Sequence, residues 1–178
     1  MTGTTPPPPP PVIPVPDVGA ARERVATTRN RLETTIARAS TFSEDELQQR
    51  VNDEWSAVES LRHIVLVIDL WLSKAISGEK DPFHPMALPP SFMPPNLFPD
   101  SSIDPHARPS FAEACEVARD RITSVEEYVD TLTSDELSRP IEAHAGTVGG
   151  ALGVLFDELA AHDRFMNRDL DLLRQREG

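Results

Sequence analysis

Apolar residues recur at intervals of three and four positions in four long segments of the chain, which is the spacing of amphipathic helices. The pattern predicts four long helices, over residues 18–39, 56–77, 110–132 and 147–174. Asp17 can cap the start of the first helix, and Gly78 can terminate the second. Residues 43–46 have the composition of a capping box and predict a short extra turn. The second helix is apolar on nearly all sides, so we expect it to be central and buried.

Two proline-rich segments interrupt this pattern. Residues 1–16 include the run Pro6–Pro11 and two further prolines, which favour an extended chain, so we expect a disordered arm ahead of a helical domain over residues 17–178. Residues 81–109 contain nine prolines, which neither a helix nor a central strand accommodates. A connection of that length either carries function or crosses the domain. We therefore predict an all-α fold, a four-helix bundle with a long crossover connection.

The expected crossover connection also carries large apolar side chains, among them Phe83, Phe92, Met93 and Phe98. Two roles are open for these side chains. They cover an open end of the bundle and shape a binding pocket, or they only seal the hydrophobic core.

The charge balance limits the classes of partner. The chain has 29 acidic and 17 basic side chains, for a formal net charge of −12, which disfavours binding to nucleic acid or to an anionic membrane surface. We see neither a secretory signal nor an apolar run long enough to span a membrane, so we expect a cytoplasmic protein. The single cysteine, Cys115, excludes an internal disulfide and a cysteine-based zinc site, and its place on an apolar stripe predicts a core residue. A small-molecule substrate is the expected partner, and a homodimer stays open.

One spacing occurs twice and predicts a metal site. Glu59 precedes His63 by four positions, and Glu158 precedes His162 by four, so each pair lies on one helix face. Glu158 and His162 project from or beside an apolar stripe, where an isolated carboxylate needs a partner. A divalent metal held by His63, Glu158 and His162 would supply it, whereas a metal-free hydrogen bond between the buried His and Glu would also satisfy both groups. Glu59 either orients His63 from behind, or faces solvent or pairs with Arg62.

The residues around His63 resemble a known family. Residues 55–64 are similar to the W-S-x-x-E-x-L-x-H-I signature of the DinB-like superfamily. Residues 81–85 and 158–171 resemble an actinobacterial branch similar to mycothiol-dependent maleylpyruvate isomerase, and the likeness extends over residues 18–174. The resemblance implies a four-helix bundle with a long crossover, and a divalent metal held by the triad named above. Asp163 stands where a second histidine is expected, and alanines at 160 and 161 replace bulkier or acidic residues, so the substrate pocket should differ.

This ligand set bounds the expected chemistry. Two imidazoles and one carboxylate leave an open position on Zn²⁺, the metal we expect, while Ni²⁺ and Fe²⁺ accept the same ligands. The resemblance implies a thiol cosubstrate, mycothiol, and hence a metal-dependent S-transferase, isomerase or hydrolase acting on a small molecule. Two alternatives stay open: a non-catalytic bundle that binds metal or a small molecule, and a metal-free structural or partner-binding protein. Trp55 and Trp71 flank the second helix and are expected in the core rather than in a pocket.

Overall fold

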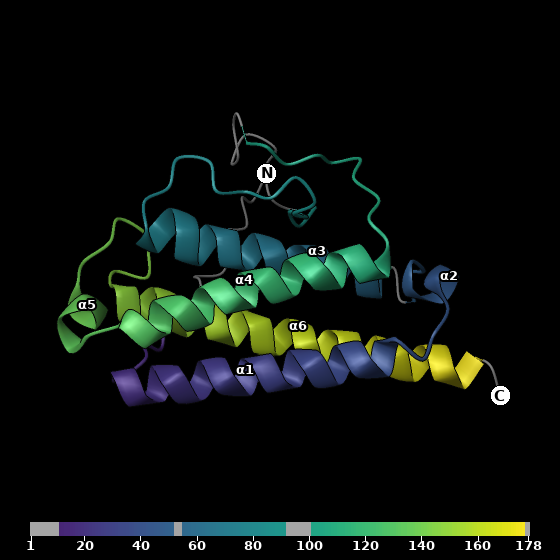
Figure 1. Ribbon diagram of the computed structural model, residues 1–178, viewed down its shortest axis with the longest axis horizontal. Helices are drawn as coiled ribbons and strands as arrows, with labels where there is room; N and C mark the ends of the chain where they lie inside the picture. Colours follow the sequence, from purple (N-terminus) through teal and green to yellow (C-terminus); the bar gives the residue numbers. More distant parts are fainter. Residues whose placement is uncertain (1–10, 52–54, 92–100, 177–178) are drawn as a thin grey trace, which may run out of the picture.

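The computed structural model describes residues 11–51, 55–91 and 101–176 (Figure 1). Over these residues the chain is helical apart from loops and one isolated bridge between Pro140 and Thr147. The helices, in chain order, are α1 (Val18–Ala39), α2 (Glu44–Leu47), α3 (Ala57–Ile68), the π-helix η1 (Asp69–Ile76), α4 (Phe111–Thr131), α5 (Ser134–Ser138) and α6 (Val148–Arg176).

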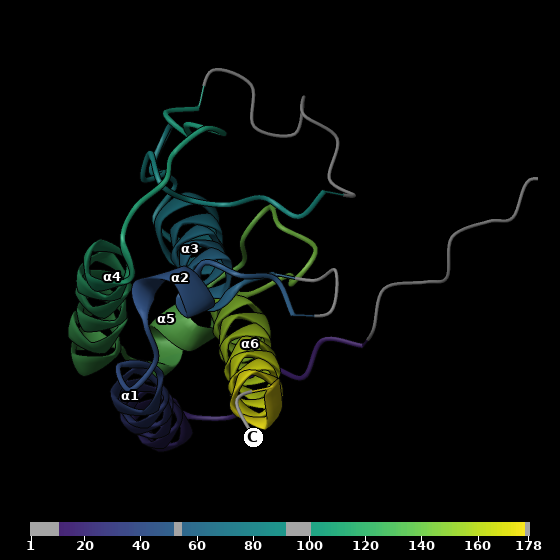
Figure 2. The ribbon, with the colours of Figure 1, turned by 90° about the vertical axis from the view of Figure 1, so that its right-hand side faces the viewer.

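The long helices α1, α3, α4 and α6 form a four-helix bundle. In the end-on view of Figure 2 they occupy the four corners, and the neighbouring pairs α1–α4, α4–α3, α3–α6 and α6–α1 are in contact. Helices α3 and α4 run in the same direction, because the chain after η1 returns along the length of the bundle before α4 begins (Figure 1). The predicted all-α bundle with a long crossover is therefore confirmed.

Side chains fix where the helices begin. Asp17 accepts a hydrogen bond of 2.8 Å from the backbone N–H of Ala20 and so caps α1, as its sequence position predicts. Ser56 and Ser110 each start a capping box, with glutamates three positions later, and these boxes set the first residues of α3 and α4.

The second predicted helix differs from the structure in its final third. It is α-helical only to Ile68 and then continues as the π-helix η1, in which Ser77 donates to the carbonyl of Leu72, five positions earlier. The wider turn changes the direction of the side chains that follow, which carries Leu70, Trp71 and Ala75 to the wall of a cavity. Short π-helical stretches inside α-helices are frequent at functional sites.

The core lies between the four long helices. On α3 every residue from Leu61 to Ile68 is buried, which confirms the expectation that this segment is central. On α6 the predicted stripe is buried from Val148 to Leu173, with His162 half-buried. Cys115 is 3% exposed on the inner face of α4, so it is a core residue as expected.

The bundle begins before residue 17. Val15 is 4% exposed, and its backbone N–H donates to the carbonyl of Gly149 at 2.9 Å. A Cβ atom on Gly153 would come within 2.1 Å of the carbonyl oxygen of Ile13, so a glycine at this position is needed for the extended chain to pass so close to α6. The last residues of the expected disordered arm are thus docked on the bundle, while residues 1–10 lie outside the described residues.

The crossover connection contributes to the core. Phe83, Met86 and Ala87 are buried, and Leu88 donates its backbone N–H to the carbonyl of Arg62 on α3. Three of the apolar side chains for which two roles are open, Phe92, Met93 and Phe98, lie outside the described residues.

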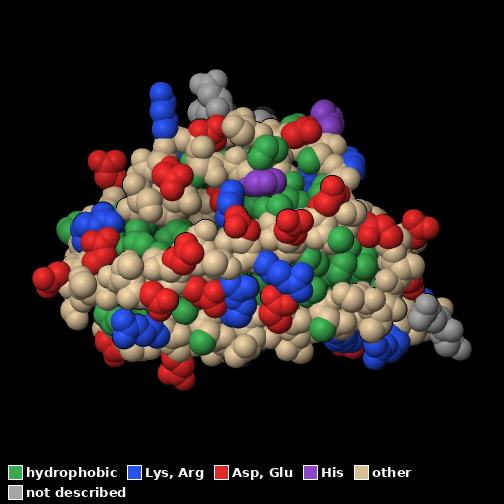
Figure 3. Space-filling model, in the orientation of Figure 1, with side chains coloured by type: hydrophobic (Ala, Val, Ile, Leu, Met, Phe, Trp, Pro, Cys, Tyr) green, Lys and Arg blue, Asp and Glu red, His purple; other side chains and the backbone are tan. Residues whose placement is uncertain are grey.

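Charged side chains of both signs are intermixed on the face formed by α1 and α4 (Figure 3). Ion pairs join the two helices there: Arg29 binds Glu126 at 2.5 Å, and Arg119 binds Glu33 at 2.8 Å. These pairs are partly exposed, so each contributes at most about 1 kcal/mol to stability.

Candidate metal centre

A cavity of about 550 Å³ opens between η1, α3 and α6, and we call it the histidine cavity. Its walls also include Trp55, two positions before α3, the crossover connection and the link between α5 and α6. It is lined by Trp55, His63, Leu66, Val67, Leu70, Trp71, Ala75, Pro90, Ala143, His144, Glu158, Ala161 and His162. The volume is in the range of small-molecule sites. All three residues predicted to hold a metal therefore line one cavity.

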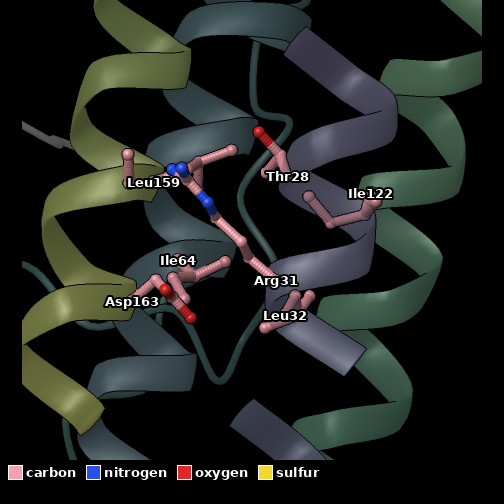
Figure 4. A pocket seen from close by; sticks show the side chains of 8 residues that line it. Thr28, Arg31, Leu32, Ile64, Ile122, Leu159 and Asp163 are labelled. Atoms are coloured by element: carbon pink, nitrogen blue, oxygen red, sulfur yellow. The ribbon is translucent and has the colours of Figure 1, made fainter. Parts of the chain in front are cut away.

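On the side of α6 that faces α1, the space beside Leu159 is small. Figure 4 shows a gap between α1 and α6 that Arg31 crosses from α1, next to Leu159 and Asp163. The gap measures about 20 Å³, which is room for one water molecule and no ligand. The histidine cavity is thus the larger of these two spaces and the one with candidate chemistry.

His63 and His162 are in ring contact across the interface of α3 and α6. Their ring centroids are 4.4 Å apart with planes inclined by 62°. Trp55 covers both rings, with centroid distances of 4.2 Å to His63 and 5.4 Å to His162. The structure thus brings together two residues that are far apart in sequence and lie on facing helices, as the metal hypothesis requires.

The backbone fixes the tautomer of His63. Its Nδ1 lies 2.8 Å from the carbonyl oxygen of Leu88, and because a carbonyl can only accept, Nδ1 carries the proton in the neutral ring. Nε2 then keeps a free lone pair. Burial lowers the pKa of His63 to about 4, against a smaller opposing effect of the Leu88 carbonyl, so the ring is neutral near pH 7. A metal-binding histidine usually has this arrangement, with one nitrogen donating to a carbonyl.

His162 has a buried polar atom without a partner. Its Nδ1 makes no hydrogen bond, although the atom is inaccessible to solvent. Burial, and secondarily the neighbouring His63, lower the pKa of His162 to about 4, so this ring is also neutral. An unsatisfied buried nitrogen costs about 1–3 kcal/mol, which a ligand or metal at this position would recover.

Glu158 is half-buried one turn before His162. Among the described residues its carboxylate forms no ion pair, and its polar contact is with the indole N–H of Trp71. Burial raises the pKa of Glu158, and the indole N–H of Trp71 opposes that rise through a weak contact that does not meet the full geometry of a hydrogen bond. The negative charge of a carboxylate in this setting is not compensated, and a bound divalent cation would compensate it.

Glu59 has a different role from the one considered for it. Its carboxylate accepts from the backbone N–H of Ser56 at 2.9 Å and pairs with Arg50 at 2.5 Å. It therefore caps α3 instead of orienting His63, and it does not pair with Arg62, whose Nε donates to the carbonyl of Met86. The Leu88 carbonyl takes the orienting position behind His63.

Three further contributors were not expected from the sequence. Trp55 and Trp71 line the cavity, although Trp71 is also 4% exposed and packed in the core. His144, in the link before α6, packs its ring against Trp71 with a centroid distance of 5.1 Å. The only sequence signal for His144 was a histidine in a short link between Pro140 and Gly146, which does not specify a direction.

As they stand, no three or more His, Cys, Asp or Glu side chains in the described ranges are gathered closely enough to hold a metal. The types of donor nevertheless suit a divalent metal ion. Two neutral imidazoles are in contact, and the Nδ1 of His63 is already hydrogen-bonded to the Leu88 carbonyl, which leaves Nε2 free. A carboxylate without an ion-pair partner among the described residues lies on the same wall. Loading would require the Glu158 side chain to move toward the histidines.

No helix in the described part of the chain is both long and apolar enough to cross a membrane.

Comparison with known proteins places the chain in a family. No curated protein and no solved structure gives a significant match. The model of the DinB superfamily matches residues 27–166, which include α3, η1, α4 and all three candidate ligands. The chain therefore belongs to the DinB superfamily.

Proposed function

We propose that this protein is a metal-dependent enzyme in which His63, Glu158 and His162 hold one divalent ion, Zn²⁺ before Ni²⁺ or Fe²⁺, and that it transfers a small thiol such as mycothiol to a small-molecule substrate. The observation that carries the proposal is the pair of neutral, contacting imidazoles, with a carboxylate one helical turn away that has no ion-pair partner among the described residues. Buried polar groups left unpaired are costly, and proteins keep them mainly where a ligand completes them.

The residues of the chain divide the work. The Leu88 carbonyl holds His63 in one tautomer with Nε2 free, and Trp55 covers both imidazoles and excludes water from them. Glu158 supplies the negative charge that balances a cation. The apolar walls of the histidine cavity hold the substrate. A bound ion would lower the pKa of a coordinated thiol, so that the reactive thiolate is present near neutral pH.

A second function is supported by a different observation. The three candidate ligands line the cavity but are not yet gathered around one point. A cavity with this apolar lining also suits a protein that binds a small molecule without metal and without catalysis. The two proposals differ in whether the purified protein carries a metal ion.

Elemental analysis of the protein, purified without chelators, tests the first proposal. One equivalent of metal per chain is expected, with loss of that metal in the variants His63→Asn and His162→Gln. Metal-loaded protein is then expected to accelerate the reaction of mycothiol with 1-chloro-2,4-dinitrobenzene, in which a C–S bond forms and chloride and a proton are released. Absence of stoichiometric metal, even after dialysis against Zn²⁺, contradicts the proposal and favours the metal-free alternative.

A further inference from the structure

The histidine cavity contains no cationic side chain. None of the 17 lysines and arginines lines it, and all of them lie within the described residues, because residues 1–10, 52–54, 92–100 and 177–178 contain neither type. Among the described residues, the charged side chain on its wall is Glu158, in a chain with a net charge of −12. An anionic group on the body of a ligand would lose its hydration here without gaining a counter-charge, which is strongly unfavourable.

One hydrogen-bond donor on the cavity wall lacks an acceptor. Trp71 is 4% exposed, and its indole Nε1 is buried with no hydrogen-bond partner. Trp71 and Glu158 line the same cavity, and the N–H interacts with the carboxyl of Glu158, although the contact does not meet the full geometry of a hydrogen bond. The ring of His144 packs edge-on against the indole at 71°, which restrains its orientation. Such an orphan donor in an apolar wall selects a ligand that brings an acceptor.

We propose that the histidine cavity binds a neutral, largely apolar molecule with one hydrogen-bond acceptor, such as a carbonyl oxygen, that takes the N–H of Trp71. Trp71 thereby determines specificity, and substrates with an anionic body are disfavoured. The description of this molecule as the substrate rests on the proposed function. The binding of such a molecule does not depend on the proposed function. Any positive charge from a metal would lie at the histidines, where the thiol is held, and not beside the body of this molecule.

Matched fluorescent probes test the charge preference on the full-length protein kept free of metal by EDTA. N-phenyl-1-naphthylamine is neutral, and 8-anilinonaphthalene-1-sulfonate has the same ring skeleton with an added anionic group. The neutral probe is expected to bind at least about 10-fold more tightly. Filling the cavity by Ala161→Phe, or by Ala143→Phe if the first variant does not fold, should abolish that binding. Equal affinity for the sulfonate, or binding that both filled variants retain, overturns the proposal.

The role of the Trp71 donor is tested with 6-propionyl-2-dimethylaminonaphthalene, a neutral naphthyl ketone. Trp71→Phe should weaken the ketone roughly 3- to 10-fold, the value of one lost hydrogen bond, and leave N-phenyl-1-naphthylamine unchanged. Tyr128→Phe, which removes a hydrogen-bond donor outside the cavity, is the matched control and should change neither probe. If Trp71→Phe weakens the binding of both probes equally, Trp71 contributes only apolar contact, and its assignment as a hydrogen-bond donor to the ligand is overturned.

A second measurement needs no variant. The chain has two tryptophans, so the ¹⁵N–¹H spectrum shows two indole N–H signals. The ketone should shift one of them downfield, whereas N-phenyl-1-naphthylamine should not. Unchanged indole signals at saturating ketone contradict the assignment. Because all binding is measured without metal, these results and the metal content of the protein stand or fall independently.

Discussion

Helices α3 and α6 carry the same Glu-x-x-x-His spacing, and the two copies are used differently. On α3, Glu59 accepts from the backbone at the helix start and pairs with Arg50, so its charge is compensated. On α6, Glu158 faces the histidine cavity, and its charge is not compensated by an ion pair among the described residues. The histidines of the two copies, by contrast, share one environment and touch each other.

The difference comes from position along each helix. Glu59 lies in the first turn of α3, where free N–H groups and a partial positive charge attract a carboxylate. Glu158 lies in the middle of α6, where the backbone groups are already paired and a carboxylate must find a partner elsewhere. Equal spacing therefore produces a helix cap in one copy and a candidate metal ligand in the other.

The largest expected effect concerns the histidines that the two copies share. Their pKa values are lowered from 6.5 to about 4 in the folded protein. Between these values the unfolded chain binds more protons than the folded one, so stability falls as the pH is lowered through this window. The loss from pH 6.5 to pH 5 should be about 1.6 kcal/mol for each histidine. The raised pKa of Glu158 acts in the opposite direction.

Urea denaturation of metal-free protein at the two pH values measures this loss. The double variant His63→Asn, His162→Gln is the comparison, and it should lose much less stability on acidification. An equal loss of stability in wild type and in the double variant would show that groups other than His63 and His162 cause the acid sensitivity.

Adjacent positions on α6 should differ in how much stability the same substitution costs. Asp163 faces α1 and accepts from Thr35 Oγ1 at 2.6 Å, in a network with Asn167, whereas His162 has its unpaired Nδ1. Asp163→Leu leaves the Thr35 hydroxyl without its acceptor and should cost about 1–3 kcal/mol. His162→Leu removes the unpaired atom and should change stability by less than about 1 kcal/mol. Thermal denaturation at pH 7 compares them, and a reversed order would refute the picture of a satisfied and an unsatisfied side.

The smallest effect is expected for the glutamates themselves. Burial alone would raise the pKa of Glu59, but its bonds to Arg50 and Ser56 outweigh that effect and lower it. Its ionised form therefore stabilises the fold, and Glu59→Gln should cost about 0.5–1 kcal/mol. The pKa of Glu158 is raised, so Glu158→Gln should stabilise metal-free protein at pH 7. Chemical denaturation of both variants tests the opposite signs, and a loss in Glu158→Gln would show that its carboxylate is already compensated.

Helical periodicity was sufficient for much of the fold. The first helix was predicted over 18–39 and found as Val18–Ala39, and the nine prolines of 81–109 indicated the crossover. Periodicity could not reveal η1, because the change from α- to π-helix alters the hydrogen bonding by one position without changing the apolar composition. The docking of Val15 also has no local signal, since it depends on the glycines of α6.

The site was predictable only where side chains follow helix geometry. His63, Glu158 and His162 all line the cavity because each occupies an inward-facing helical position. The group behind His63 is the backbone carbonyl of Leu88, which any residue could supply. His144 and Trp55 lie outside regular helix, so no period constrained their direction. Whether the triad binds a metal stays a prediction.

Calorimetric titration of Zn²⁺ into four metal-free proteins tests the central claim most directly. Wild type should bind one ion per chain. Glu158→Gln and His162→Gln should weaken binding by about 100-fold or more, while Glu59→Gln, which makes the same change at the same spacing on α3, should leave the affinity unchanged. Failure of wild type to bind Zn²⁺, or equal weakening by Glu59→Gln and Glu158→Gln, would contradict a metal centre formed by His63, Glu158 and His162.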